Sequence, residues 1–290
     1  MPERTRADVA LVERGLATSR EKAQALIMSG AVYMREVKVL KPSTPVNADD
    51  PLLVKSNANP YVSRGALKLE KALRRFGVDV TDVVALDIGA ATGGFTDVLL
   101  HAGAKRVFAV DVGYGQLDWK IRTDPRVTVM ERTNARYLTT AQLDGEIPSL
   151  TVMDVSFISV KLILPVAASL MENRGLFCIL IKPQFEAGRE HVGKKGVVRD
   201  PAVHGSVIRT VRDFAPSFGY FMAALDYSPI KGPEGNIEYI ACLKPEPLNA
   251  NSKPEEGATE LAQPLDDAAV AAVVAAAHQE LDRKNTDNPD

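Results

Sequence analysis

Residues 85–100, with the sequence ALDIGAATGGFTDVLL, determine the fold class of this 290-residue chain. They combine the end of a buried strand (VVALDI, residues 83–88), a glycine-rich turn and the start of a helix. The next apolar run, residues 107–110, is followed directly by Asp111. Glycine lets backbone N–H groups approach a ligand closely, and a carboxylate that follows the second strand can bind ribose hydroxyls. The stretch therefore predicts a nucleoside cofactor at the edge of a parallel sheet.

The spacing of the glycines separates two classes of cofactor. A nicotinamide-binding turn has the pattern G-x-G-x-x-G, whereas this turn reads D-x-G-x-x-x-G-G, with Asp87 ahead of its first glycine. An acidic residue at this position suits a cationic ligand, and S-adenosylmethionine carries an ammonium and a sulfonium group. We therefore expect a methyl-donor site and not a nicotinamide site.

The order of the other segments predicts a doubly wound, Rossmann-like α/β sheet, because apolar strands and helices alternate from residue 64 onward. Before it we expect a small α+β domain over residues 1–58, with Thr5 and Ser19 capping two short helices that end at Gly15 and Gly30. The predicted parts are the small domain (1–58), a linker (59–63), the sheet domain (64–245) and an acidic flexible tail (246–290) with a short helix that lacks large apolar anchors.

The composition excludes several classes of protein. The N-terminal sequence MPERTRADVA has no apolar core typical of a signal peptide, and the apolar run at residues 268–277 is too short to cross a bilayer. Cys178 and Cys242 lie in apolar runs, which fits a reducing compartment. We therefore expect a cytoplasmic protein with no membrane association.

The charge is unevenly distributed along the chain. Residues 246–290 hold 3 basic and 10 acidic side chains, whereas the first 75 residues hold 14 basic and 8 acidic ones. The excess of positive charge at the N-terminus allows a polyanion to dock there, although a mild excess is also common on an ordinary solvated face.

Polar residues that follow apolar strands are the candidates for chemistry, because ligands of open parallel sheets bind at the carboxyl ends of the strands. Asp154 follows the run SLTVM, Lys182 follows LFCILI, and Glu238 follows the loop KGPEGN. Lys68 lies on a helix just before the first strand. Taken singly, each has a simpler explanation, since such a lysine is often exposed and such a carboxylate often caps the next helix.

The N-terminal part resembles the S4-like RNA-binding domain in residues 11–32, LVERGLATSREKAQALIMSGAV, and in KPST at 41–44. The resemblance implies that two helices present basic side chains to RNA phosphates, and the candidates are Arg6, Arg14, Arg20 and Lys22. In that family a glycine-containing turn usually joins the short strands. Here Arg35 and Glu36 occupy it, so the turn must be built differently.

Together, Lys68, Asp154, Lys182 and Glu238 resemble the K-D-K-E tetrad of FtsJ-type ribose 2′-O-methyltransferases. Residues 1–245 resemble the TlyA family of rRNA methyltransferases more closely still. The motifs that carry this resemblance occur in order: SRGALKL, D-x-G-A-x-T-G-G-F-T, DVGYGQL, ERTNAR, DVSFIS, KPQFE-x-G and GNIEY. The resemblance implies an S-adenosylmethionine-dependent enzyme that methylates the ribose 2′-hydroxyl of cytidines in rRNA of both ribosomal subunits.

The expected chemistry is an in-line displacement by the hydroxyl oxygen. A lysine beside a second ammonium and a low-dielectric wall should have a lowered pKa and accept the hydroxyl proton. We assign to Lys182 the role of this base or of the group that orients the hydroxyl, assisted by Lys68, with Asp154 and Glu238 positioning the two amines. The sequence leaves open which lysine loses its proton.

For the cofactor, the resemblance and the predicted fold agree on a set of contacts. Asp87 precedes them, and Thr133 and Asn134 would either lie near the adenine or cap a helix. The methionine moiety is expected at Gly89, Ala90, Thr92, Gly94 and Phe95, and the ribose and adenine at Asp111 and Val112.

We expect rRNA or ribosomal subunits as partners, no metal ion and a monomeric protein. The alternative from another class is a cofactor- and RNA-binding protein that acts in ribosome assembly or signalling without catalysis. An intact tetrad favours the enzyme.

Overall fold

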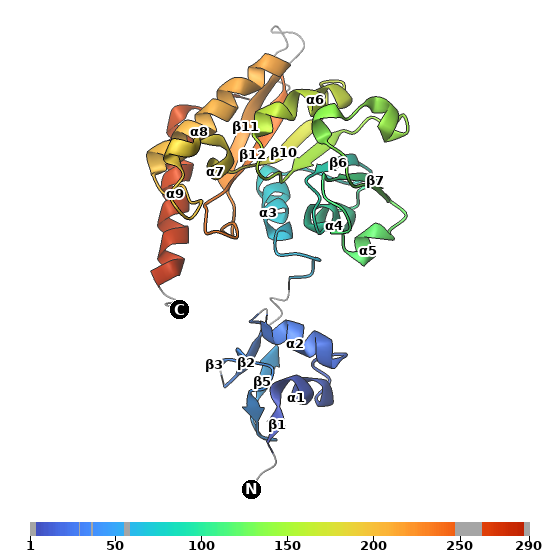
Figure 1. Cartoon of the computed structure of the whole chain (residues 1–290), viewed down its shortest axis with the longest axis vertical. Coiled ribbons are helices and arrows are strands. Elements are labelled where there is room, and N and C mark those ends of the chain that lie inside the picture. Colours follow the sequence, from blue (N-terminus) through green and yellow to red (C-terminus); the bar gives the residue numbers. More distant parts are fainter. Residues whose placement is uncertain (1–3, 29, 36, 55–58, 247–262, 287–290) are drawn as a thin grey trace. The chain divides into compact units, whose positions relative to one another are not determined.

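The computed structural model describes residues 4–28, 30–35, 37–54, 59–246 and 263–286. Within these ranges the chain divides into two compact units, Met1–Pro60 and Tyr61–Asp290 (Figure 1). Each unit has its own buried core.

The N-terminal unit packs a helix pair against short antiparallel strands. Strand β2 lies between β3 and β5, and β1 pairs with β4. Leu11, Ile27 and Val32 are fully buried at its centre. Its elements are β1 (Thr5–Arg6), α1 (Ala7–Glu13), α2 (Arg20–Met28), β2 (Val32–Met34), β3 (Val37–Lys38), β4 (Pro45–Val46) and β5 (Leu52–Val54).

Local signals in this unit have mixed outcomes. The Ser19 hydroxyl accepts a hydrogen bond from the backbone N–H of Lys22 (3.2 Å), so its predicted role as a cap is confirmed. The prediction for Thr5 is wrong: Thr5 lies in strand β1 opposite Val46, and α1 begins after Arg6 without a side-chain cap. The turn between β2 and β3 has Arg35 at φ 50°, a left-handed conformation that glycine usually supplies.

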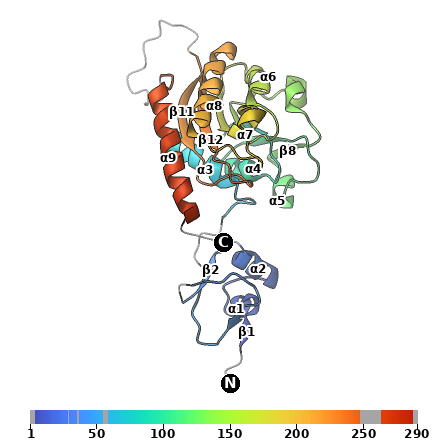
Figure 2. The same cartoon turned by 60° about the vertical axis from the view of Figure 1, so that its left-hand side comes forward.

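The second unit is a mixed sheet covered by helices on both faces (Figures 1 and 2). Within residues 61–246, seven strands form the order β11-β12-β10-β9-β6-β7-β8, in which β12 runs antiparallel to β10 and β11. The strands are β6 (Val84–Ile88), β7 (Arg106–Val110), β8 (Val127–Met130), β9 (Leu150–Met153), β10 (Leu176–Ile181), β11 (Tyr220–Tyr227) and β12 (Tyr239–Pro245). The predicted doubly wound α/β class is confirmed.

The connecting helices of this unit include short single turns. The α-helices are α3 (Ala66–Phe76), α4 (Gly94–His101), α5 (Trp119–Arg122), α6 (Leu164–Leu170), α7 (Pro183–Glu186), α8 (Pro201–Phe214) and α9 (Asp267–Thr286). The 3-10 helices are η1 (Ala135–Tyr137), η2 (Thr140–Leu143), η3 (Val160–Leu162), η4 (Arg189–His191) and η5 (Ala215–Phe218). None of the helices in the described ranges is long and apolar enough to cross a membrane.

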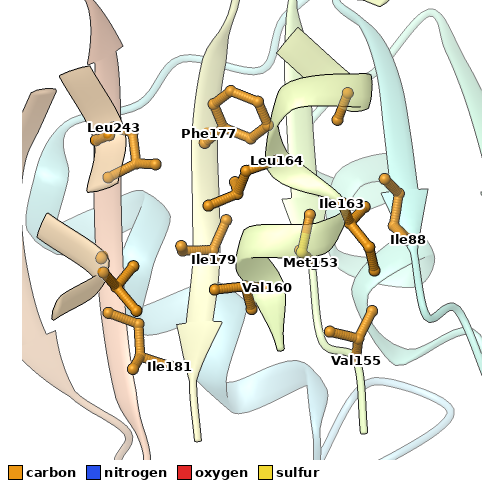
Figure 3. Packing of buried hydrophobic residues seen from close by; sticks show 14 of the residues in the cluster. Ile88, Met153, Val155, Val160, Ile163, Leu164, Phe177, Ile179, Ile181 and Leu243 are labelled. Carbon is orange, nitrogen blue, oxygen red and sulfur yellow. The ribbon is translucent and has the colours of Figure 1, made fainter. Parts of the chain in front are cut away.

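Alternation along the strands divides the core between the two faces of the sheet. In β10, Phe177, Ile179 and Ile181 pack in the cluster that includes residues of α6, α8 and α9 (Figure 3). Cys178 and Leu180 point to the other face, into the cluster with residues of α3 and α4. Both faces of the central strands are therefore buried, and ligands reach the sheet only at its edges.

The C-terminal helix α9 differs from the expected short, weakly anchored helix. Figure 2 shows it along the side of the unit beside β11, and Val270, Val274, Ala277 and Leu281 are buried in the same core as α8. The segment was expected to lack large apolar anchors, and Leu281 is the one large side chain among its buried residues. Side chains spaced by three or four residues form one stripe on a helix, so these four side chains dock together.

Candidate active site

The four predicted catalytic residues meet at the carboxyl ends of the parallel strands. Asp154 directly follows β9 and Lys182 directly follows β10. Glu238 immediately precedes β12, and Lys68 lies in the first turn of α3. Because β12 runs antiparallel to β10, its start lies at the same edge as the end of β10.

These side chains form a chain of alternating charges. Lys68 Nζ lies 2.6 Å from Glu238 Oε2 and 3.4 Å from Asp154 Oδ2. Lys182 Nζ lies 2.5 Å from Asp154 Oδ1, and it donates a hydrogen bond to the Ser156 hydroxyl at 2.9 Å. Asp154 therefore bridges the two ammonium groups.

The charge state of Lys68 differs from the expectation of a lowered lysine pKa. Burial alone would lower the pKa of Lys68, but the charges of Asp154 and Glu238 outweigh burial and raise it. Its side chain is 8% exposed and that of Glu238 1% exposed, so solvent screens this pair little. Lys68 therefore keeps its proton next to the two carboxylates.

A cavity of about 530 Å³ opens beside these charges, within the range of small-molecule sites. All four charged residues border it, together with the glycine-rich turn between β6 and α4. Gly89 has a φ of 86°, and a Cβ there would lie 2.6 Å from the backbone oxygen of Asp154. Only glycine allows the turn to pass this closely to the loop that carries Asp154.

The predicted cofactor residues fall into two groups. Those assigned to the methionine moiety all line the cavity: Gly89, Ala90, Thr92, Gly94 and Phe95. The others lie outside its lining. Asn134 accepts a hydrogen bond from the backbone N–H of Arg136, as the helix-cap alternative predicts, and Thr133 donates to the Glu131 carbonyl. Val112 is largely exposed.

The two acidic residues of the predicted cofactor site bind protein groups in this structure. Asp111 accepts hydrogen bonds from the backbone N–H groups of Ala91 (2.8 Å) and Gly113 (2.7 Å), and so shapes the glycine-rich turn. Asp87 is fully buried and accepts a hydrogen bond from the Thr96 hydroxyl at 2.6 Å. Burial is the main reason that its pKa is raised to about 7.

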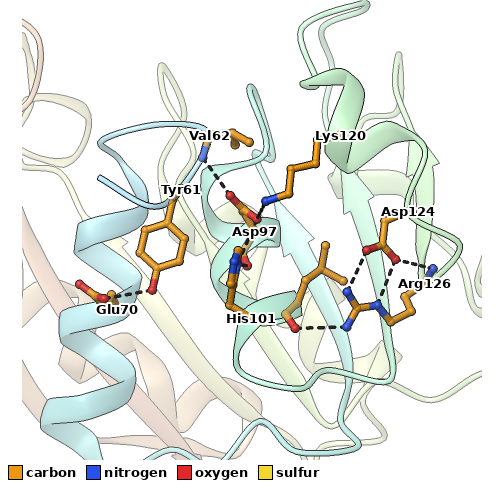
Figure 4. Close-up of polar contacts among 9 residues, drawn as sticks. Tyr61, Val62, Glu70, Asp97, His101, Lys120, Asp124 and Arg126 are labelled. Carbon is orange, nitrogen blue, oxygen red and sulfur yellow. Dashed lines mark hydrogen bonds and ion pairs between the residues drawn. The ribbon is translucent and has the colours of Figure 1, made fainter. Parts of the chain in front are cut away.

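Helix α4, which continues the glycine-rich turn, is fixed by a polar cluster around Asp97 (Figure 4). The buried Asp97 carboxylate accepts a hydrogen bond from the backbone N–H of Val62 (2.9 Å) and pairs with Lys120 (3.2 Å). Tyr61 contacts the ring of His101 edge-on and donates to Glu70. Residues 61 and 62, which the sequence places in a linker, thus pack on α3 and α4.

The cavity lining also includes residues that the sequence did not single out, among them Ser156, Phe157 and Phe185. Phe157 is 91% exposed and has a φ of 64°, a conformation that costs a bulky residue on the order of 1–3 kcal/mol. Its ring centroid lies 5.0 Å from that of Phe185. The motifs DVSFIS and KPQFE contain all three, but their spacing does not show which aromatic rings face solvent.

The predicted RNA-binding side chains have partners within the N-terminal unit. Arg6 and Arg20 pair with the buried Asp8 at 2.9 and 3.0 Å. Arg14 donates to the backbone carbonyls of residues 47, 48 and 50. Lys22 is exposed. The three arginines therefore also support the fold of this unit.

Metal coordination has no candidate in the part of the chain that the structure describes. There, no group of three or more His, Cys, Asp or Glu side chains is arranged to hold a metal ion.

Comparison with known proteins identifies relatives of both units. Residues 61–245 match the model of the FtsJ-like methyltransferases, and residues 5–52 match the S4 domain. The chain is 44% identical to the 16S/23S rRNA (cytidine-2′-O)-methyltransferase TlyA of Mycobacterium tuberculosis, over 84% of this chain and 91% of that protein.

Two further relatives match nearly the whole chain. A Bacillus subtilis protein provisionally named rRNA methyltransferase YqxC is 49% identical over 99% of both chains. A solved structure from Streptococcus thermophilus, provisionally named a hemolysin, is 42% identical and has a TM-score of 0.73, covering 99% of this chain and 100% of that one. Both matches extend over α9.

Proposed function

Because this chain belongs to the FtsJ-like methyltransferases that carry an S4 domain, we propose that it methylates the ribose 2′-hydroxyl of cytidines in ribosomal RNA. The observation that carries the proposal is the alternating chain of Lys68, Asp154, Lys182 and Glu238 beside a cavity bordered by a glycine-rich turn. Both ribosomal subunits are the proposed substrates, as the name of the Mycobacterium tuberculosis relative states for that protein. An enzyme acting on rRNA would work in the cytoplasm.

The residues at the cavity fit S-adenosylmethionine at one end. The turn from Gly89 to Phe95 lines the cavity, its glycines let the backbone pass close to the neighbouring segments, and the acidic groups beside it suit a cationic ligand. Asp111, just beyond the turn, is the proposed acceptor for the ribose hydroxyls, which requires it to share or exchange its backbone partners. When bound, the cofactor supplies a methyl group activated by a sulfonium.

The two lysines have different roles in this proposal. Lys68 keeps its proton between Asp154 and Glu238 and so fixes both carboxylates. Lys182 borders the cavity and contacts Asp154 and Ser156. We assign to Lys182 the positioning of the 2′-hydroxyl and, in its neutral form, the acceptance of the hydroxyl proton.

The cavity entrance also suits a nucleoside. Phe157 presents its ring to solvent next to Phe185, and exposed aromatic faces stack on unpaired RNA bases. The N-terminal unit would supply contacts to phosphates through Lys22 and the outer faces of Arg6 and Arg20, which are about half exposed.

The experiment is a map of ribose methylation on rRNA from cells with and without this protein. The purified chain, incubated with S-adenosylmethionine and rRNA from the deficient cells, should restore the missing methyl groups on cytidine. Binding of cofactor and RNA without any methyl transfer would instead support the non-catalytic alternative. Comparing naked rRNA with assembled subunits in the same assay identifies the substrate.

A further inference from the structure

The segment that carries Asp154 contacts the segment that carries Lys182 at two places. The first is the contact of Lys182 with Asp154 and Ser156, and the second is at Glu186. This residue ends α7, four positions after Lys182. Glu186 Oε2 accepts a hydrogen bond from the Ser159 hydroxyl at 2.7 Å, and Oε1 accepts one from the backbone N–H of Val160 at 2.8 Å. The glutamate of KPQFE thus binds the last residue of DVSFIS, Ser159, and the residue that follows it, Val160.

The contact point on the DVSFIS side is fixed by the core. The side chain of Val160 is 2% exposed and points into the hydrophobic cluster, near Ile179 in Figure 3. Val160 also begins η3, whose first N–H groups have no partner within that helix. The Glu186 carboxylate supplies one of these missing partners, and it thereby ties α7 to a fixed part of the unit.

The groups that face the cavity lie between these two contacts. Lys182 makes the first contact, with Asp154 and Ser156, and the rings of Phe157 and Phe185 contact each other between the first contact and the second. Phe157 has a left-handed backbone conformation, which a bulky residue keeps only where its surroundings hold it. Glu186 lies outside the cavity lining, so it can act on the cavity only through these neighbours.

We propose that Glu186 is a positioning residue, whose carboxylate holds residues 154–160 against residues 182–186 and thereby aligns Lys182 and Phe157 for the RNA ribose. This inference rests on the proposed function. It assigns a role to the glutamate of KPQFE and to the second serine of DVSFIS. Burial also raises the pKa of Glu186, against the effects of its hydrogen bonds and of Lys161.

The test compares Glu186→Ala with the wild-type full-length chain, using single-turnover methylation of rRNA at saturating cofactor and calorimetry for S-adenosylmethionine. The variant should lose at least about tenfold in the rate of methyl transfer, since small displacements of reacting groups cost this much or more. Its cofactor affinity should stay close to that of the wild type, and it should remain folded at the assay temperature although the lost hydrogen bonds lower its melting temperature. Glu186→Gln should recover part of the rate, because its amide oxygen still accepts from Val160.

The pairing with Ser159 is tested by a double-mutant cycle. Ser159→Ala should lose less rate than Glu186→Ala, and the double variant should be no slower than Glu186→Ala alone. Two control variants should methylate at the wild-type rate. They are Glu190→Ala, an exposed residue on the neighbouring η4, and Ser169→Ala, whose hydroxyl bonds to its own helix.

Three results would overturn the inference: a folded Glu186→Ala chain with the wild-type rate, a loss confined to cofactor affinity, or additive effects of Ser159→Ala and Glu186→Ala. If Glu186→Ala does not fold, Ser159→Ala and Glu186→Gln decide by the same criteria. A wild-type chain that does not methylate rRNA contradicts the proposed function instead, so the two failures are distinguishable.

Discussion

Two clusters of charge in this molecule look alike chemically and differ in what surrounds them. In the N-terminal unit, the fully buried Asp8 accepts hydrogen bonds from Arg6, Arg20 and Gln24, which are 2, 12 and 16 residues away. In the second unit, Lys68 reaches Asp154 and Glu238 across 86 and 170 residues. The first cluster joins the start of α1 to α2, whereas the second borders a cavity.

A buried, paired carboxylate therefore does not by itself indicate catalysis. Where the partners are close in sequence and surround the carboxylate, as at Asp8, the cluster stabilises the local fold. Partners brought from distant strands to a cavity leave part of their surface for a ligand. We therefore expect substitutions in the Asp8 cluster to change stability, and substitutions in the cavity cluster to change chemistry.

The largest expected effect is that of Lys182→Ala on methyl transfer. Loss of a general base typically costs about 10²- to 10⁴-fold in rate, and the Lys182 side chain ends at a cavity, so its loss should disturb little packing. Single-turnover methylation should fall by this factor while cofactor affinity, RNA affinity and melting temperature are kept. Lys105→Ala, which changes an exposed lysine before β7, is the control. A comparable rate for both variants would contradict a chemical role for the cavity cluster.

Removal of α9 should lower the stability of the second unit without removing any residue of the cavity cluster. Val270, Val274 and Leu281 are each at most 4% exposed, and full burial of such a side chain contributes about 1.5–3 kcal/mol. A chain ending at Pro245 should lose several kcal/mol of stability, measured by denaturant unfolding, but should still methylate below its melting temperature. An unchanged unfolding midpoint would show that α9 contributes little.

Asp8→Asn should destabilise the N-terminal unit at neutral pH. The Arg6 hydrogen bond, with those of Gln24 and Arg20, holds the pKa of Asp8 well below its usual range despite burial. A carboxyl group with a lowered pKa stabilises the fold above its unfolded pKa of about 3.9, and this stability is lost as the pH falls. The melting temperature of the variant should lie several degrees below that of the wild type at pH 7 and approach it in acid. A constant difference from pH 7 to pH 2 would contradict this.

Asp87→Asn should show the opposite dependence on pH, with the smallest change in acid and the largest near neutral pH. The pKa of Asp87 is raised to about 7, so its carboxyl group favours the fold fully below the unfolded pKa of about 3.9. That contribution is lost as the pH rises toward 7. Relative to the wild type, the variant should therefore gain stability between pH 4 and pH 8 in denaturant unfolding. A flat difference would show that Asp87 ionises normally.

The sheet and the charged cluster at the cavity could be predicted from the sequence, because the ends of the apolar runs show where the strands end and which polar residues follow them. Asp154 and Lys182 directly follow parallel strands, and the carboxyl ends of such strands meet at one edge. The charge state of Lys68 was not predictable, because it depends on two carboxylates that only the fold brings within reach. The pairing of Glu186 with Ser159 was hidden for the same reason, although both residues stand in motifs that the sequence shows plainly.

Other differences arise where tertiary partners override local signals. Thr5 has the chemistry of a helix cap, yet its pairing with Val46 makes it part of a strand. The stripe of α9 consists of valine, alanine and one leucine, so the sequence pattern is weak and the docking depends on the surface presented by β11 and α8. Asn134 could serve either of two predicted roles, and only the position of the Arg136 N–H distinguishes them.

The position of α9 at the far end of the chain has a consequence for synthesis. Chains leave the ribosome N-terminus first and their domains generally fold as units, so the N-terminal unit can form once residue 54 has emerged. The sheet unit reaches its full stability only with Leu281, because the apolar surface of β11 and α8 stays uncovered until then. A ribosome that stalls shortly before α9 is complete therefore holds a folded S4 domain joined to a sheet unit whose apolar surface is still exposed.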